Sequence, residues 1–131
     1  MRTVRGMIYT DKMCFEPGGI TIDEDRIAKI VCFTEEELTK EEKETYILPG
    51  LVDTHFHGCA GFDFCDGTAE AMCTIASYEL THGITTITPA TMTLAEDTLM
   101  DICAACSAAV ETEVLKENVP LCDILKGIYL E

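Results

Sequence analysis

Three polar side chains alternate along an apolar segment near the middle of the chain. Asp53, His55 and His57 stand two positions apart within residues 51–57, which we predict to form a strand. Since side chains two apart on a strand point to the same side, we expect the three to share one face. Two imidazoles at this spacing can converge on one metal ion such as zinc or iron. The residues alone leave a second interpretation open, in which the histidines are surface groups or are satisfied by hydrogen bonds.

The residues after this strand predict the elements that position it. Residues 58–67 are rich in Gly and Asp and indicate a loop. Residues 69–82 repeat apolar side chains at helical spacing, with Thr68 as a candidate N-cap and Gly83 as the stop. Residues 84–88 (ITTIT) are β-branched throughout, which predicts a second strand.

The remaining residues extend this alternation of strands and helices. A second helix is predicted to begin at a capping box of Thr93 and Glu96 and to stop before Pro120. Residues 124–130 predict a third strand. Such an order implies parallel strands joined by right-handed crossovers. Active sites form at the carboxyl ends of parallel strands, which is where the histidine pair stands.

The first third of the chain has a different pattern. Three short β-branched or apolar runs predict strands at residues 3–9, 19–22 and 26–33. Pro and Gly at 17–19 and acidic residues at 23–25 separate them. We expect this small β-structure to end at the acidic run 35–44, which we interpret as a solvated turn or linker.

Other polar residues near the histidine pair have local explanations. Asp53 is expected either to orient the histidine ligands from behind or to serve as a structural carboxylate. His82 falls in the last turn of a predicted helix, where an imidazole is favoured for structural reasons. Asp63 and Asp66 either hydrogen-bond the backbone of their own loop, which is the interpretation we favour, or line a polar substrate pocket.

The chain contains eight cysteines but no clear zinc pattern. Cys103 and Cys106 have CxxC spacing without a second matching pair, so we predict buried thiols that carry no metal. Cys59 and Cys65 stand in the Gly-rich loop, where one of them is a candidate reactive thiol.

Composition excludes several classes of partner. A net charge of −15 argues against nucleic acid, because phosphate binding needs clustered Lys and Arg. No apolar run approaches the roughly 20 residues that cross a bilayer, and the first residues lack the apolar core of a signal peptide. We expect a cytoplasmic protein without a membrane partner.

The motifs around the histidine pair resemble a known group of enzymes. The stretch PGLVDTHFHG (49–58) resembles the first barrel strand of the amidohydrolase superfamily. HGCAGFDFCD (57–66) and THGITTITPAT (81–91) are similar to the corresponding regions of N-acetylglucosamine-6-phosphate deacetylases. GIYLE (127–131) resembles the third barrel strand of that family, where a glutamate is a metal ligand.

The resemblance implies a site for one or two divalent ions, zinc or iron. His55 and His57 would take the first metal position, and Glu131 would bind or bridge at the second. Retention of both histidines favours the two-metal design. Without the resemblance, a glutamate at the end of a chain would indicate only a solvated side chain.

The resemblance also implies a fold. Residues 49–131 would form the first three β-strands and two helices of an α/β fold, the (β/α)₈ metal-dependent hydrolase barrel. Residues 1–48 would form part of a small N-terminal β-sandwich-like domain. Because a barrel needs about 250 residues, we expect an N-terminal portion only. The general-base aspartate of the family and two later histidine ligands would lie beyond residue 131, so no catalytic residue is assigned.

The implied activity is removal of the acetyl group from N-acetylglucosamine 6-phosphate, giving glucosamine 6-phosphate and acetate. The partner would be this small amino-sugar phosphate, and the full-length form would be a homodimer. We expect the 131-residue chain alone to be inactive. Two alternatives stay open. One is part of another amidohydrolase, such as a dihydroorotase-like cyclic amidase, which the glutamate ending the third strand disfavours. The other is a non-catalytic acidic metal-binding module.

Overall fold

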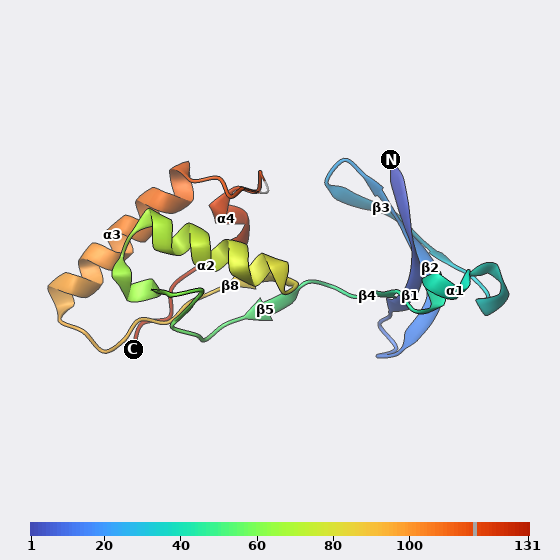
Figure 1. Ribbon diagram of the computed structural model, residues 1–131, viewed down its shortest axis with the longest axis horizontal. Helices are drawn as coiled ribbons and strands as arrows, with labels where there is room; N and C mark the ends of the chain where they lie inside the picture. The colour runs from blue at the N-terminus through green and yellow to red at the C-terminus, as the bar shows by residue number, and fades with distance from the viewer. Residues whose placement is uncertain (117) are drawn as a thin grey trace. The chain divides into compact units, whose positions relative to one another are not determined.

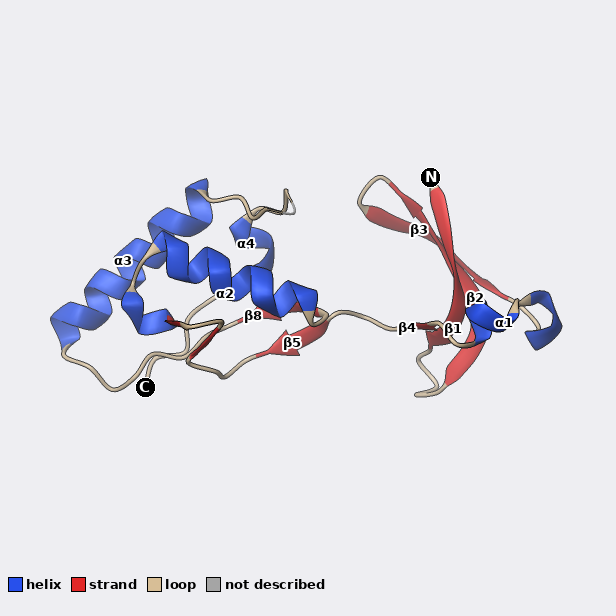
Figure 2. Ribbon diagram, viewed as in Figure 1, coloured by secondary structure: helices blue, strands red, loops and turns tan. Residues whose placement is uncertain are grey.

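The computed structural model describes residues 1–116 and 118–131. The chain divides into two compact units, Met1–Pro49 and Gly50–Glu131. Long strands dominate the first unit, whereas the long helices all lie in the second (Figure 2). The protein is therefore mixed α/β. No helix among these residues has the length and apolar character needed to cross a membrane.

The first unit is built on a four-stranded sheet. Its strands are β1 (Arg2–Tyr9), β2 (Phe15–Asp23), β3 (Arg26–Cys32) and β4 (Tyr46–Ile47), in the order β3-β2-β1-β4. β2 pairs antiparallel with both β1 and β3, and β4 pairs parallel with β1. Two expectations are corrected here. The β-structure continues past the acidic run into β4, and Pro17, Gly18 and Gly19 lie inside β2 rather than in a break.

The glycines inside β2 allow close contact with neighbouring side chains. A Cβ added at Gly18 would meet Ile8 Cδ1 and Val31 O, both at 2.7 Å, and one at Gly19 would meet the Phe33 ring at 3.0 Å. Turn-forming residues therefore serve the packing of a central strand at this point, which the sequence pattern did not indicate.

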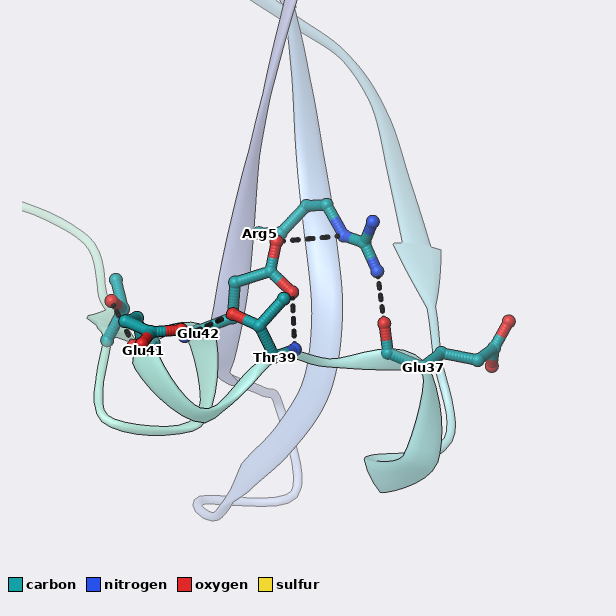
Figure 3. Close-up of polar contacts among 6 residues, drawn as sticks. Arg5, Glu37, Thr39, Glu41 and Glu42 are labelled. Carbon is teal, nitrogen blue, oxygen red and sulfur yellow. Dashed lines mark hydrogen bonds and ion pairs between the residues drawn. The ribbon is translucent and has the colours of Figure 1, made fainter.

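The acidic run is mostly exposed to solvent, as expected, but it is helical rather than an irregular turn or linker. It folds into η1 (Glu35–Glu37) and α1 (Lys40–Lys43), capped by Thr34 and Thr39 through capping boxes. Arg5 on β1 holds both short helices (Figure 3): its guanidinium donates to Glu37 O, and its Nε lies 3.4 Å from Glu42 Oε1. The same guanidinium lies 4.7 Å from the centre of the Phe33 ring.

The second unit contains two long helices and two short sheets. The strands are β5 (Leu51–Asp53), β6 (Gly58–Cys59), β7 (Phe62–Asp63) and β8 (Ile84–Ile87). The helices are η2 (Phe64–Asp66), α2 (Ala69–Thr81), α3 (Glu96–Thr112) and α4 (Leu121–Ile124). β5 and β8 pair in parallel, and β6 and β7 form an antiparallel hairpin. α2 and α3 lie beside each other on one side of β5 and β8 (Figure 1).

Local signals placed α2 correctly. Thr68 is its N-cap, with the side chain accepting a hydrogen bond from Ala71 N, and Gly83 beyond its end has φ of +80°. The predicted start of α3 is wrong. That helix begins at Glu96 after Ala95 as N-cap, and no Thr93 cap forms.

The predicted third strand is also corrected. α4 occupies its first residue, and residues 125–129 make only isolated parallel bridges, Ile87 to Leu125 and Ala90 to Tyr129. Residues 127–131 are nevertheless extended beside the continuation of β8, because Tyr129 N donates to Pro89 O at 2.9 Å. The segment has the position of a third parallel strand without its full ladder.

The hydrophobic core lies in the second unit. Residues from η2, α2, β8, α3 and α4 form it, including Phe64, Met72, Ile75, Ile87 and Leu121. Ile87, the last residue of β8, belongs to this core, and Phe56, which lies between the two histidines, packs against it.

Candidate metal centre

His55, His57 and Glu131 come together in the second unit. Among the residues that the structure describes, they form a group in which one potential ligand atom from each lies within 4.8 Å of the others. His55 Nε2 lies 3.0 Å from Glu131 Oε1, and His57 Nε2 lies 3.9 Å from the same oxygen. The two imidazole rings are nearly perpendicular, at 89°, with centres 5.5 Å apart. The convergence expected from the carboxyl ends of parallel strands is therefore present.

The histidines reach this position from an irregular segment rather than from a strand. β5 ends at Asp53, so the expected strand 51–57 is too long. The Asp53 side chain accepts a hydrogen bond from His55 N at 3.0 Å, which bends the backbone where the ladder stops. This contact is to the His55 backbone, so Asp53 positions the residue rather than its ring.

Backbone hydrogen bonds fix the irregular segment on both sides. Thr88 N donates to Asp53 O at 2.9 Å, and Ala90 N donates to Phe56 O, between the two histidines, at 2.7 Å. Beyond the pair, Phe64 N donates to His57 O at 2.7 Å. The continuation of β8 and the start of η2 therefore hold the histidines without a regular ladder.

Glu131 is held by the same continuation of β8. Thr91 N donates to Tyr129 O at 2.9 Å, and Glu131 N donates to Thr91 Oγ1 at 3.3 Å. The Tyr129 ring packs against the His55 ring, with centres 4.9 Å apart. Sequence reasoning did not single out Thr91 or Tyr129. Tyr129 had a usable signal, because residues two apart in an extended segment share a side.

The donor set fits a transition metal. Two imidazole nitrogens and one carboxylate suit zinc or iron, and three protein ligands leave coordination positions open for other groups. His57 Nδ1 is buried and has no hydrogen-bond partner among the described residues. In metal sites the ring nitrogen that does not bind the ion usually donates to an outer acceptor, and none of the described residues supplies that acceptor for His57.

The loop acids behave as predicted. Asp63 caps η2 by accepting from Cys65 N at 2.7 Å, and Asp66 accepts from Asp63 N at 3.0 Å. His82 caps the end of α2, where its Nδ1 lies 2.9 Å from Tyr78 O. These three residues act on nearby backbone.

The surroundings of the two loop cysteines disfavour their thiolate forms. Burial, together with a hydrogen bond to Glu79 and the charge of that carboxylate, raises the pKa of Cys59 to about 12. Burial also raises the pKa of Cys65, whose sulfur accepts from Met92 N. A reactive thiolate is therefore not favoured at either position.

The CxxC pair differs in part from the prediction. Cys106 is buried, as predicted, but Cys103 is only half-buried. All eight cysteines are free thiols.

The His-His-Glu cluster lies beyond the carboxyl ends of β5 and β8, which is where α/β folds with parallel strands place their active sites. Comparison with solved structures gives the particular relatives. The N-acetylglucosamine-6-phosphate deacetylase of Thermotoga maritima superimposes with a TM-score of 0.78 and 20% identity, over 98% of this chain and 31% of that one. The deacetylase of Mycobacterium smegmatis gives 0.75 and 20% identity, over 100% and 35%.

Sequence comparison also finds a relative that is an N-acetylglucosamine-6-phosphate deacetylase. No protein-family model matches the chain. The N-acetylglucosamine-6-phosphate deacetylase of Vibrio furnissii is 38% identical over 47 residues, which are 36% of this chain and 12% of that protein. The resemblance predicted from the motifs is confirmed: the chain has the fold of these deacetylases over about a third of the length of the solved structures.

Proposed function

We propose that this chain forms the N-terminal portion of a metal-dependent amidohydrolase that deacetylates N-acetylglucosamine 6-phosphate to glucosamine 6-phosphate and acetate. The observation that carries the proposal is the convergence of His55, His57 and Glu131. The fold likeness supports it, as does the structure of a Mycobacterium smegmatis deacetylase variant in complex with N-acetyl-D-glucosamine-6-phosphate, at a TM-score of 0.72.

In this proposal residues 49–131 correspond to the first three strands and two helices of a (β/α)₈ barrel, and residues 1–48 to part of a β-sandwich-like domain. The two compact units of the structure divide one residue later, after Pro49. The whole protein is proposed to be a cytoplasmic homodimer.

The residues of the cluster have separate roles. His55 and His57 would hold zinc or iron through their imidazoles, and Glu131 would bind at or bridge to a second ion. These residues would place a divalent ion where it could lower the pKa of a bound water and polarise the acetamide carbonyl. Asp53 keeps the His55 backbone in its bent form. Tyr129 limits the rotation of the His55 ring by packing against it.

Proton transfer requires a residue outside this set. The general acid and base that the resemblance implies is an aspartate, and loss of such a group costs about 10²- to 10⁴-fold in rate. We therefore propose that the 131-residue chain binds metal but does not turn over substrate.

Metal titration of the 131-residue chain tests the proposal. Zinc affinity is measured by competition with a chromophoric chelator for the wild type, His55→Ala and Glu131→Gln. Loss of a ligand should weaken binding at least about 10-fold, the effect seen even for outer groups of metal sites. His82→Ala is the matched control, because this histidine caps α2.

Two results would contradict the proposal. Zinc that remains fully bound in His55→Ala would belong to other residues, such as the cysteines. Acetate release from N-acetylglucosamine 6-phosphate by a folded monomer of the chain would show that the proposed inactivity is wrong.

A further inference from the structure

Three consecutive residues after β8 connect the parts of the candidate centre. Ala90 N donates to Phe56 O at 2.7 Å, which joins the segment to the histidine pair. Thr91 N donates to Tyr129 O at 2.9 Å, which joins it to the segment that ends in Glu131. Met92 N donates to Cys65 Sγ at 3.1 Å, which joins it to η2. The segment 90–92 therefore fixes the histidine segment and the glutamate segment to each other.

Thr91 is the residue of this segment whose side chain takes part. It is 0% exposed. Its hydroxyl oxygen accepts a hydrogen bond from Glu131 N at 3.3 Å, while its own N–H bonds Tyr129 O. A β-branched side chain has few χ1 rotamers, so the hydroxyl is held in one direction. Thr91 thus holds the backbone on both sides of Leu130.

A carboxylate on an otherwise free segment would sample many positions. The two hydrogen bonds of Thr91 restrict the backbone of Glu131, and its Oε1 lies 3.0 Å from His55 Nε2 in that geometry. Because metal affinity depends on ligands that are held in place before the ion binds, a residue that restricts one ligand raises the affinity.

We infer that Thr91 is a positioning residue for the metal ligand Glu131, acting through its buried hydroxyl. The inference rests on the proposed function, since it assumes that Glu131 ligates a metal. Neither the family motifs nor the chemistry of the HxH pair assigns a role to this threonine.

Isosteric substitution tests the hydroxyl. Thr91→Val keeps the shape and removes the acceptor, whereas Thr91→Ser keeps the acceptor and removes a methyl group. Zinc affinity of the 131-residue chain, measured by chelator competition, should fall about 10- to 100-fold in Thr91→Val and stay within about 3-fold of wild type in Thr91→Ser. Thr93→Val is the matched control, because Thr93 is exposed and two residues away.

A double substitution separates positioning from general stability. In a Glu131→Gln background, Thr91→Val should change zinc affinity less than about 3-fold, because the ligand that it positions is already lost. A purely structural role would lower affinity equally in both backgrounds. The absorption spectrum of the Co²⁺-loaded chain gives a second readout, which should differ between wild type and Thr91→Val and be restored in Thr91→Ser.

Amide exchange in the wild type keeps the inference testable if Thr91→Val does not fold. The Glu131 amide should exchange at least about 10-fold more slowly than in an unfolded peptide, because it donates to a buried oxygen. Unprotected exchange, equal zinc affinity in wild type and Thr91→Val, or failure of Thr91→Ser to restore it would each overturn the inference. If wild type binds no more zinc than His55→Ala, the proposed function fails instead.

Discussion

The two units differ in how strand pairing relates to burial. In Met1–Pro49 the strands pair over long stretches but few side chains are buried, whereas in Gly50–Glu131 the paired strands are short and many side chains are buried. β2 and β3 pair along most of their length, yet Ile27 and Ile30 are 62% and 58% exposed. β5 has only three residues, but in the helix α2 beside it the side chain of Ile75 is completely buried, at 0% exposure. Hydrogen-bonded regularity and core formation are therefore separate properties in this molecule.

The difference bears on where chemistry can be placed. A regular ladder fixes each side chain at the pleat spacing, so adjacent positions point to opposite faces. The second unit instead has short extended segments held on a buried core, and these segments can bend. His55 and Glu131 lie close together because the regular pairing of β5 ends at Asp53, and the hydrogen bond from Ala90 N to Phe56 O then fixes the backbone again.

The largest change in the free energy of unfolding is expected from a substitution in the core of the second unit. Ile75→Ala should cost about 2 to 5 kcal/mol in the free energy of unfolding, because it leaves a cavity against Phe64 and Met72. Ile30→Ala in the first unit should cost less than about 1 kcal/mol, since the side chain is already exposed. Hydrogen exchange followed by mass spectrometry in urea reports each unit separately.

The same hydrogen-exchange measurement can show that the two units are not energetically separate. If Ile75→Ala removed protection from β1 and β2 as strongly as from α2, the two units would unfold together. The separation of ladder regularity from burial would then have no energetic meaning.

A smaller loss of stability is expected when a side chain is added at Gly6, where the first unit is tightly packed. A Cβ added at Gly6 would lie 2.5 Å from Thr45 O, the backbone oxygen that accepts from Met7 N. Backbone cannot move as freely as a side-chain end, so Gly6→Ala should cost about 1 to 3 kcal/mol. Faster exchange confined to β1 and β4 is the expected signature, and unchanged urea midpoints would contradict it.

A pH effect of smaller size is expected at Cys59. Burial raises its pKa from 9.0 to about 12, so the folded state favours the protonated thiol. This stabilisation is complete below pH 9 and is lost as the pH rises from 9 toward 12. The half-buried position keeps the effect below that of Gly6→Ala. Urea midpoints at about pH 8 and about pH 10.5 should fall less in Cys59→Ala than in wild type. Equal slopes would contradict the prediction.

The smallest effect is expected at the surface of the first unit. Arg5→Met removes the ion pair with Glu42 and the bond to Glu37 O but keeps the apolar stem (Figure 3). The cost should be about 0.5 to 1 kcal/mol, as for partly exposed pairs. Lys12→Met, which removes an exposed pair with Glu16, is the control and should leave the urea midpoint unchanged. A larger loss in the control would reverse the ranking.

Much of the second unit followed from signals within a few residues. The Thr68 cap and Gly83 delimit α2 because capping and left-handed backbone are local requirements. The β-branched run 84–88 contains β8. The capping box at Thr93 failed for a local reason too, since Ala95 takes the extended N-cap conformation and Glu96 and Asp97 then fill the first turn.

The wrong predictions for the first unit concern residues that favour one local structure in isolation but adopt another in the folded chain. Pro17 and Gly18 favour turns in isolation, but in β2 the absence of a Gly18 side chain makes room for Ile8. The acidic run is highly charged and still ordered, because Thr34, Thr39 and Arg5 satisfy its backbone and carboxylates. Contacts between separate strands decided the first case, whereas the second depended on local capping boxes together with the distant Arg5.

The amino-acid sequence by itself determined the chemical identity of the candidate ligands and the helices that flank them, because residue type and capping are local. Only the tertiary structure decided how the ligands meet. β5 ends at Asp53, and the expected third strand has isolated bridges. Ala90 bonds the histidine segment, and Thr91 bonds Glu131, which is 40 residues further along the chain. These outcomes depend on hydrogen bonds between distant segments, whose partners become neighbours only when the core around Ile75 and Ile87 has formed.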